Sequence, residues 1–364
     1  MGQVVNDSAR FPAAQAPSQM GWPEEAPRDV ETLEEFLSRP TPAVVDLMAR
    51  LRGDLLLLGA AGKMGPTLAR MAKRATDAAG VSRRIIAVSR FSQKSDRAKL
   101  ERWGIETIAG DLLDESFVDS LPRAENVVWM AGMKFGATGN ESLTWAMNAY
   151  LPGMVCKRFR GSRIAAFSTG NVYGLVPVVS GGSIESDEPN PQGEYAMSCL
   201  GRERIFEHLS RAHGVPVTLL RLNYACELRY GVLVDLAQKI HADQPIDLSM
   251  GMVNVIWQGD ANAMALLSLE HAASPARVLN LAGPETLSVR RVCGQLGELM
   301  GRSPRFTGQE QPAALLSNGQ LGHELMGYPS LPIGRLIRWV AQWVQAGGEM
   351  LGKPTKFEVR DGRF

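Results

Sequence analysis

The chain has 364 residues, 45% of them hydrophobic, which is enough for a large α/β unit and a smaller partner with real cores. The 39 Lys and Arg residues nearly balance the 38 Asp and Glu residues, so no overall field exists to hold nucleic acid or an anionic membrane. We therefore expect a small-molecule substrate, with no nucleic acid and no membrane as partners.

Other features of composition concern location and metals. The longest apolar stretches, 54–61 and 261–269, are too short to cross a bilayer, and residues 1–10 lack the pattern of a signal peptide. The four cysteines stand far apart without a CxxC pair, and no HExxH pattern occurs. These observations predict a cytoplasmic protein with reduced thiols and no metal.

The chain begins with a segment, 1–28, rich in Pro, Gln, Ala and Ser, which predicts a tail or arm. Two short helices are expected at 31–38 and 43–51. Strands and helices then alternate, which is typical of right-handed βαβ units and a parallel sheet. The expected strands are 54–58, 84–88, 106–109, 126–130, 163–168 and 216–221, and the expected helices are 65–79, 94–103, 115–120, 141–157 and 195–213.

After residue 222 the alternation breaks. Helices are expected at 231–241 and 260–272, an extended segment at 253–257, and a closing helix at 336–351 with Trp339 and Trp343 as packing residues. We therefore predict an α/β fold: a Rossmann-type, doubly wound parallel sheet of six or seven strands with a smaller, partly interleaved C-terminal substrate domain. The expected division is an arm with short helices (1–52), a dinucleotide-binding domain (53–222 with about 253–285), and a substrate domain with the closing helix (223–252 and 286–364).

A glycine pattern, Gly59, Gly62 and Gly65, lies between the first apolar strand and the start of a helix. The first glycine permits a tight turn, the second lets the backbone approach a pyrophosphate, and the third lets helix and strand pack closely. This context predicts a dinucleotide site that includes Lys63 and Met64. Lys63 either touches phosphate or is exposed.

The end of the second strand indicates which dinucleotide binds. Ser89 and Arg90 stand where an NAD site usually places an acid. A hydroxyl and a guanidinium suit a 2′-phosphate better than a diol, so NADP is favoured, with NAD as the alternative and a solvated Arg90 as the simpler interpretation. After the third strand, Asp111 and Leu112 are expected near the adenine, although Asp111 equally suits a cap of the following turn.

Further segments follow the glycine pattern in a recognisable order. These are Gly110-Asp111, Met130-Ala131-Gly132, Asn148, Thr169-Gly170-Asn171-Val172-Tyr173-Gly174 and Tyr195. Over about residues 54–285 the chain resembles the extended short-chain dehydrogenase/reductase family, in its epimerase/dehydratase branch. The resemblance implies an NAD(P)-dependent oxidoreductase or epimerase acting on a carbinol or carbonyl, and a homodimer built on the long helices.

The resemblance also implies roles for individual residues. Thr169 aligns the substrate oxygen, and Tyr195 exchanges a proton with it. Ala131 and Gly132 border the cofactor, and Lys134 faces it, because epimerases of this family carry a lysine near the cofactor in the same loop.

One departure from the family concerns catalysis directly. Cys199 stands four residues after Tyr195, where the family has a lysine that binds the nicotinamide ribose and lowers the pKa of the tyrosine. Without that charge the tyrosine is expected to keep the pKa of a free phenol, about 10. Arg202 lies two turns along the same helix, ~10 Å away, and is expected to be a poor substitute.

Three interpretations of this departure stay open. Lys134 supplies the missing charge, another group handles the proton in an altered chemistry, or catalysis is lost and the protein is a dinucleotide-binding regulator or scaffold.

The remaining residues concern the substrate. Gly170 and Asn171 stand where nucleotide-sugar dehydratases carry Asp-Glu, which disfavours a dehydratase. Asn171 and Asn223 are the candidate substrate contacts, although an asparagine at a strand end often only forms a turn. The arginine that clamps a nucleotide-sugar diphosphate is missing, with Arg229 as the nearest candidate. We therefore expect a small polar substrate: a sugar, a sugar acid, or a related hydroxy or keto compound.

Overall fold

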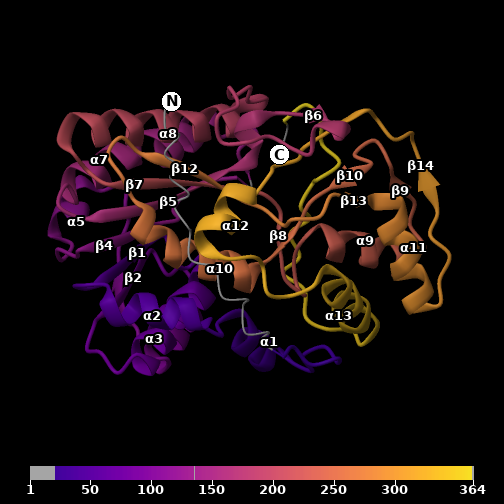
Figure 1. Ribbon diagram of the computed structural model, residues 1–364, viewed down its shortest axis with the longest axis horizontal. Coiled ribbons are helices and arrows are strands. Elements are labelled where there is room, and N and C mark those ends of the chain that lie inside the picture. The colour runs from indigo at the N-terminus through magenta and orange to yellow at the C-terminus, as the bar shows by residue number, and fades with distance from the viewer. Residues whose placement is uncertain (1–20, 135, 363–364) are drawn as a thin grey trace, which may run out of the picture.

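The computed structural model describes residues 21–134 and 136–362 and is built on a seven-stranded parallel sheet (Figure 1). The strand order is β12-β7-β5-β4-β1-β2-β3. The strands are β1 (Leu55–Leu58), β2 (Ile85–Ser89), β3 (Glu106–Ala109), β4 (Asn126–Trp129), β5 (Arg163–Thr169), β7 (Val217–Leu222) and β12 (Arg277–Leu281). The predicted Rossmann-type sheet is confirmed. The order reverses between β1 and β4, so a crevice opens there at the carboxyl ends of the strands, where such folds bind ligands.

Both faces of the sheet are covered, because successive side chains of each strand point to opposite sides. Leu55 and Leu57 of β1 pack into a core with α2 (Pro42–Arg50), α3 (Gly65–Ala78) and α10 (Gln258–Leu267). Leu56 and Leu58 pack on the other side with α5 (Glu115–Ser120), α7 (Leu151–Arg158) and α8 (Gly193–His213). Figure 1 shows α7 and α8 above the sheet and α2 and α3 below it.

The helix expected at 141–157 is divided into three parts. An α-helical turn, α6 (Glu141–Trp145), leads into a wider π-helical turn, η1 (Ala146–Tyr150), and α7 follows. Such turns occur frequently at functional sites. The π-turn contains Asn148, which is fully buried.

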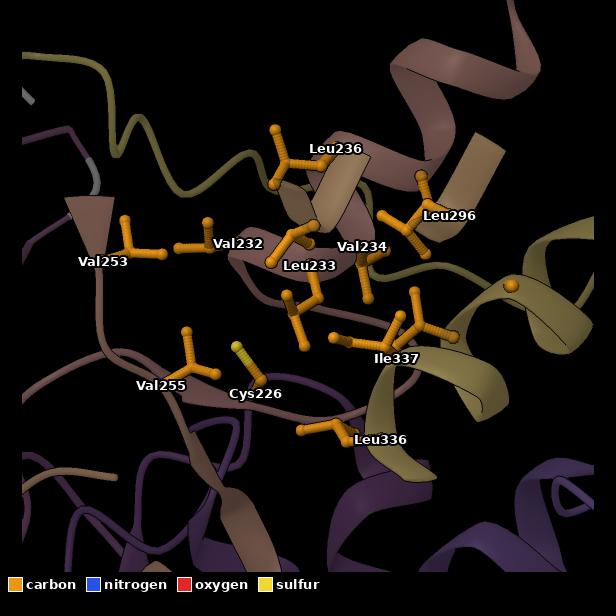
Figure 2. Packing of buried hydrophobic residues seen from close by; sticks show 14 of the residues in the cluster. Cys226, Val232, Leu233, Val234, Leu236, Val253, Val255, Leu296, Leu336 and Ile337 are labelled. Atoms are coloured by element: carbon orange, nitrogen blue, oxygen red, sulfur yellow. The ribbon is translucent and has the colours of Figure 1, made fainter. Parts of the chain in front are cut away.

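The C-terminal part has its own core, between α9 (Val232–His241), α11 (Val289–Met300) and α13 (Ile333–Gln345). Figure 2 shows Leu233 and Val234 of α9 close to Leu296 of α11 and Ile337 of α13. The closing helix was expected to reach residue 351, which is wrong: it ends at Gln345, and Gly347 with a φ of 68° turns the chain away.

The remaining elements are short. They are α1 (Val30–Leu37), α4 (Lys94–Arg102), α12 (Gln320–Met326), the 3₁₀ turns η2 (Gly170–Tyr173), η3 (Val178–Ser180) and η4 (Ser268–His271), and the strand pairs β6 (Val176–Pro177) with β15 (Ala313–Ala314), β8 (Ala225–Cys226) with β11 (Ile256–Trp257), β9 (Ile246–Asp247) with β14 (Phe306–Thr307), and β10 (Met252–Val253) with β13 (Leu287–Ser288). Of the helices that the structure describes, none is long and apolar enough to cross a membrane.

The segment predicted as an arm is only partly described, since residues 1–20 lie outside the described residues. Residues 21–28 are not an arm. The Trp22 ring packs edge-on against Trp257 and Trp339, and Arg335 of α13 donates a hydrogen bond of 2.9 Å to the Trp22 carbonyl. Trp339 is a packing residue, as expected, and is completely buried.

Candidate active site

The glycine loop joins β1 to α3, and its backbone can come close to a pyrophosphate. A Cβ on Gly59 (φ 89°) would lie 2.6 Å from the Ala131 nitrogen, and a Cβ on Gly65 would lie 2.1 Å from the Ala60 oxygen. These two positions therefore require glycine. Gly62 differs, because the nearest neighbour of an added Cβ is its own loop carbonyl, at 3.6 Å. Its backbone is open to the cleft, and the loop can cradle a phosphate group there.

The end of β2 lies directly beside this loop, because the Gly59 and Ala60 amides both donate to the Val88 carbonyl, at 2.9 and 3.1 Å. Ser89 is half-buried and Arg90 is exposed at this edge. After β3, the Asp111 carboxylate accepts a hydrogen bond of 3.0 Å from the Leu113 amide, so Asp111 forms the turn that was one of its two expected roles. Leu112 belongs to the core under α5.

The loop after β4, with Ala131 and Gly132, is held by the buried Asn148 of the π-turn. The Asn148 side chain accepts a hydrogen bond of 2.8 Å from the Met133 amide and donates one of 2.9 Å to the Met133 carbonyl. A Cβ on Gly132 would lie 2.6 Å from the Arg202 guanidinium. The loop is thus pinned on both sides just before Lys134.

Thr169 ends β5 with its hydroxyl oriented by a neighbour. Its oxygen accepts hydrogen bonds from the Asn171 backbone amide, at 3.2 Å, and from the Asn171 side-chain amide, at 2.9 Å. A hydroxyl has a single proton to donate. Both Asn171 contacts are made as acceptor, and a hydrogen bond between Thr169 and Tyr195 lowers the pKa of the Tyr195 phenol.

Tyr195 lies in the first turn of α8, with the fully buried Cys199 one turn later. Burial raises the pKa of Tyr195 well above its usual value, and Cys199 raises it further, while Arg202 and the hydrogen bond from Thr169 lower it. The side chain is therefore a protonated phenol at neutral pH. Burial also raises the pKa of the Cys199 thiol.

Lys134 brings a positive charge next to this pair. Its Nζ lies 5.7 Å from the centre of the Tyr195 ring. Burial lowers the pKa of Lys134 to about 8, against an opposing effect of the nearby Cys199. The ammonium group is therefore mostly charged at neutral pH and lies beside the position at which the family's lysine would begin.

Arg202 is closer to the chemistry than its spacing indicated. Its guanidinium donates hydrogen bonds to the Phe167 carbonyl, at 2.8 Å, and to the Asn148 side chain, at 2.6 Å. It also lowers the pKa of Tyr195. The expectation of a poor substitute was wrong to this extent, because side chains of a helix point toward its N-terminus and a long one reaches back over the preceding turns.

Two adjoining cavities, of about 160 and 240 Å³, meet at these residues. Both are lined by Lys63, Met64, Lys134, Ser168, Tyr195, Leu222 and Tyr230. The larger cavity adds Gly59, Gly62, Ala131 and Gly132, and the smaller adds Thr169, Asn171, Asn223, Gln258 and Thr355. Tyr230, Gln258 and Thr355 were not predicted from the sequence, because no local motif marks them.

Asn223, a candidate substrate contact, and Arg229, the nearest candidate for a diphosphate clamp, are differently placed. Asn223 lines the smaller cavity but its side-chain amide donates a hydrogen bond of 2.7 Å to Asn254. Arg229, the nearest candidate for a diphosphate clamp, is buried and forms ion pairs with Glu227, at 2.9 Å, and Glu34, at 3.4 Å. Its guanidinium is thus used in holding α1 and does not line either cavity.

A buried ion pair packs behind the cavity wall and contacts it through Ser168. Glu203 of α8 and Arg221 of β7 lie 2.7 Å apart and are both almost fully buried. Glu203 also accepts a hydrogen bond from Ser168, which lines both cavities, and the Arg221 guanidinium lies 4.5 Å from the Tyr173 ring centre.

We predict that Glu203→Gln lowers the free energy of unfolding by about 3 kcal/mol, because it leaves the buried Arg221 charge without its partner. Urea denaturation followed by circular dichroism measures this change. Glu207→Gln, which removes an exposed pair with Arg204 on the same helix, is the control and should cost less than about 1 kcal/mol. Equal stability of the two variants would contradict the assignment.

No group of three or more His, Cys, Asp or Glu side chains that could hold a metal ion gathers anywhere in residues 21–134 and 136–362.

The comparison with known proteins places the chain in a family. Residues 55–252, more than half of the chain, match the model of the NAD dependent epimerase/dehydratase family. The chain therefore belongs to this family of NAD-dependent enzymes. No curated protein matches it.

Solved structures share the fold. The dTDP-glucose 4,6-dehydratase from Streptomyces venezuelae, with NAD bound, is 18% identical, covers 79% of this chain and 96% of its own, and has a TM-score of 0.67. The UDP-glucuronic acid 4-epimerase from Bacillus cereus, with UDP-glucuronic acid and NAD, is 16% identical, covers 81% and 99%, and has a TM-score of 0.65. The UDP-glucose 4-epimerase from Thermotoga maritima is 17% identical, with 81% and 99% covered and a TM-score of 0.65.

Proposed function

We propose that the protein is an NADP-dependent oxidoreductase or epimerase that acts on a carbinol or carbonyl of a small polar substrate. The observation that carries the proposal is the position of Lys134, whose ammonium group lies 5.7 Å from the Tyr195 ring centre and beside Cys199. A bound nicotinamide would accept or supply the hydride. In this proposal residues 53–222 with about 253–285 hold the cofactor, and residues 223–252 and 286–364 hold the substrate.

Residues of the chain transfer the proton, align the substrate oxygen and stabilise the charge that forms. Tyr195, as a protonated phenol, donates its proton to a substrate carbonyl oxygen and takes it back from the carbinol in the reverse direction. Thr169, held by Asn171, aligns that oxygen. The positive charges of Lys134 and Arg202 stabilise the phenolate left after the proton has moved.

The cofactor is held along the crevice at the carboxyl ends of the strands. Gly62 would approach the pyrophosphate, Gly59 and Gly65 permit the turn and the close packing of the loop, Lys63 and Met64 lie between Gly62 and Gly65, and Ala131 and Gly132 would border the nicotinamide end. Asp111 and Leu112 lie at the adenine end. The structural neighbours described above bind NAD, which supports a nicotinamide dinucleotide of either kind.

The preference for NADP depends on Arg90 and gives a prediction. We expect the wild-type protein to bind NADPH more tightly than NADH, and Arg90→Ala to weaken NADPH binding about tenfold without changing NADH binding, because a charged hydrogen bond to the 2′-phosphate is lost. Fluorescence titration with both cofactors measures this. The control is Arg97→Ala, an exposed residue paired with Glu101 on α4. Tighter binding of NADH to the wild-type protein would contradict the preference.

The substrate class is inferred from the neighbours and from the residues that the cavity lacks. The known neighbours act on sugar nucleotides, which supports a sugar-like polar substrate. Arg229 is held in buried ion pairs, so a nucleotide diphosphate lacks the clamp expected for it. Gly170 and Asn171 carry no acid or base for water elimination, so we do not propose a dehydratase. One observation favours the alternative function, a dinucleotide-binding regulator: Cys199 stands in the place of the family's lysine.

We also propose a cytoplasmic homodimer. A cytoplasmic location fits the four cysteines, which are buried free thiols. The dimer surface would be the face of α6, η1 and α8 on which Leu143, Trp145, Tyr150 and Met197 are 38–56% exposed. A groove of about 400 Å³ between α5, η1, α7 and α8 adjoins this face at Tyr150, with apolar residues such as Met154 and Ile205 in its walls together with Glu115, Asp119 and Lys157.

This surface gives a prediction on assembly. In size-exclusion chromatography with light scattering, we expect twice the chain mass of 39.6 kDa, and the mass of a monomer for Tyr150→Glu, because the substitution places a charge in an apolar interface. Tyr328→Glu, at a tyrosine 62% exposed on another part of the surface, should remain a dimer. A monomeric wild-type protein would contradict the proposal.

A further inference from the structure

Residues 351–362, which follow the last helix, form a strap across the C-terminal part of the molecule. Thr355 donates two hydrogen bonds to the Asp235 carboxylate of α9, from its amide at 2.8 Å and from its hydroxyl at 2.5 Å. Phe357 is buried in the core between α9, α11 and α13. The strap is thus attached to the part of the molecule that is proposed to hold the substrate.

Arg360 fixes the strap further along. Its guanidinium donates hydrogen bonds to the Ser249 carbonyl, at 2.9 Å, and to the Ala313 carbonyl of β15, at 2.8 Å. Two carbonyls from distant segments therefore hold this one side chain and set the course of the backbone around it. Two residues later, Gly362 meets the start of α8.

The strap and the helix that carries Tyr195 meet backbone to backbone. Gly193, the first residue of α8, has a φ of 77°, and Gly362 has a φ of 75°. A Cβ on Gly193 would overlap the Gly362 carbonyl group, and a Cβ on Gly362 would overlap the Gln192 carbonyl group. Because a side chain fits at neither glycine, the two main chains are in direct contact two residues before Tyr195.

The contact lies where α8 has little other support of its own. Helix starts are commonly fixed by a side-chain cap, and the hydrogen bonds that the structure describes include none at the start of α8. The strap also lies beside Asn171, which holds the Thr169 hydroxyl. A hollow of about 20 Å³ is lined by Asn171 and Gln192 together with Val359, Arg360 and Gly362 of the strap.

We infer that Arg360 and Gly362 are positioning residues, which hold the first turn of α8 where the Tyr195 phenol reaches the substrate oxygen. The inference rests on the proposed function, in which Tyr195 transfers the proton, and it adds a segment outside the stretch that matches the family, 55–252. None of the described residues that line the larger cavity belongs to the strap. A displaced strap should therefore slow turnover without weakening NADPH binding.

Hydrogen–deuterium exchange, followed by mass spectrometry, tests the contact without any substrate. In Gly362→Ala the added Cβ overlaps the Gln192 carbonyl group. The amides of residues 197–200, which donate to the carbonyls of the first turn of α8, should then exchange about tenfold faster, while exchange in the sheet is unchanged. Turnover should fall about 10²-fold, because a small displacement of a reacting group has this effect, and NADPH affinity should stay that of the wild type.

The matched control is Gly352→Ala. Gly352 lies in the same strap with a φ of 62°, so alanine meets the same backbone strain there, but an added Cβ has nothing within 4 Å. Exchange at residues 197–200 and turnover should both be those of the wild type.

Arg360→Met approaches the contact without backbone strain and keeps the test decisive if Gly362→Ala does not fold. It removes the hydrogen bonds to the Ser249 and Ala313 carbonyls, so it should speed the same exchange and slow turnover. Arg360→Lys should retain part of the rate, because its ammonium group keeps a donor for one carbonyl.

The inference is overturned if Gly362→Ala and Arg360→Met both behave like Gly352→Ala, if exchange becomes faster equally throughout the chain, or if faster exchange at residues 197–200 leaves turnover unchanged. A failure of the proposed function appears separately, as a wild-type protein that converts no substrate, because the exchange measurements do not depend on turnover.

Discussion

Tyr195→Phe is expected to reduce turnover by about 10³-fold, because it removes the phenol proton that the proposed function assigns for donation to a substrate oxygen. The ring itself remains, so NADPH binding should be unchanged. The rate is followed by nicotinamide absorbance, with the sugar, sugar acid, hydroxy compound or keto compound that gives the wild-type protein its highest rate.

The control for this variant is Tyr328→Phe, which removes an exposed hydroxyl far along the chain and should leave turnover unchanged. Full turnover by Tyr195→Phe would show that the roles assigned here are wrong. A wild-type protein that binds NADPH and turns over none of these compounds would instead favour the dinucleotide-binding regulator.

Lys134→Met should reduce turnover by a similar factor, about 10³, because the phenolate of Tyr195 then loses its nearby ammonium group. The position of Cys199 allows a sharper version of the experiment. Adding Cys199→Lys to Lys134→Met returns a lysine to the helix and should restore much of the rate. If the double variant turns over no faster than Lys134→Met, a lysine at position 199 does not replace the charge of Lys134, and the proposed role of that charge is contradicted.

Cys199→Lys alone is expected to bring no gain. Cys199 is fully buried beside Val172 and Tyr173, and Lys134 already brings its charge to this place. A second ammonium group there would repel the first.

The pH dependence of turnover should also reflect the charge of Lys134. With a pKa of about 8, lowered by burial, Lys134 is charged below that pH and neutral above it, so turnover should fall as the pH rises through about 8. Lys134→Arg should move this fall to higher pH, because arginine stays charged throughout the range. An unchanged profile would exclude Lys134 as its origin.

The sheet and the glycine loop could be predicted because their signals are local. The apolar run Leu55–Leu58 and three glycines at fixed spacing set a strand, a turn and a helix start within a few residues. The resemblance of its loop also predicted that Lys134 faces the cofactor, and its charge near the tyrosine was one of three interpretations left open.

Other features depend on contacts between distant segments, which a single sequence does not contain. The Pro-rich context of Trp22 indicated disorder, and only the tryptophans of α13 and β11 show where that ring packs. Arg202 was judged by its distance along the helix axis, although its side chain runs back toward the N-terminus. Thr355 belongs to a segment after the last helix and has no motif at all.

The place of Thr355 has a consequence for how such proteins diverge. It closes the wall of the smaller cavity and is tied to Asp235, yet it lies about a hundred residues beyond the stretch that matches the family, 55–252. In the proposed function, part of the wall around the substrate is thus encoded outside the stretch that carries Thr169 and Tyr195. A lineage can exchange its tail and gain a new substrate while Thr169, Tyr195 and the glycine loop stay as they are. Two relatives with identical reaction machinery can therefore differ in what they convert.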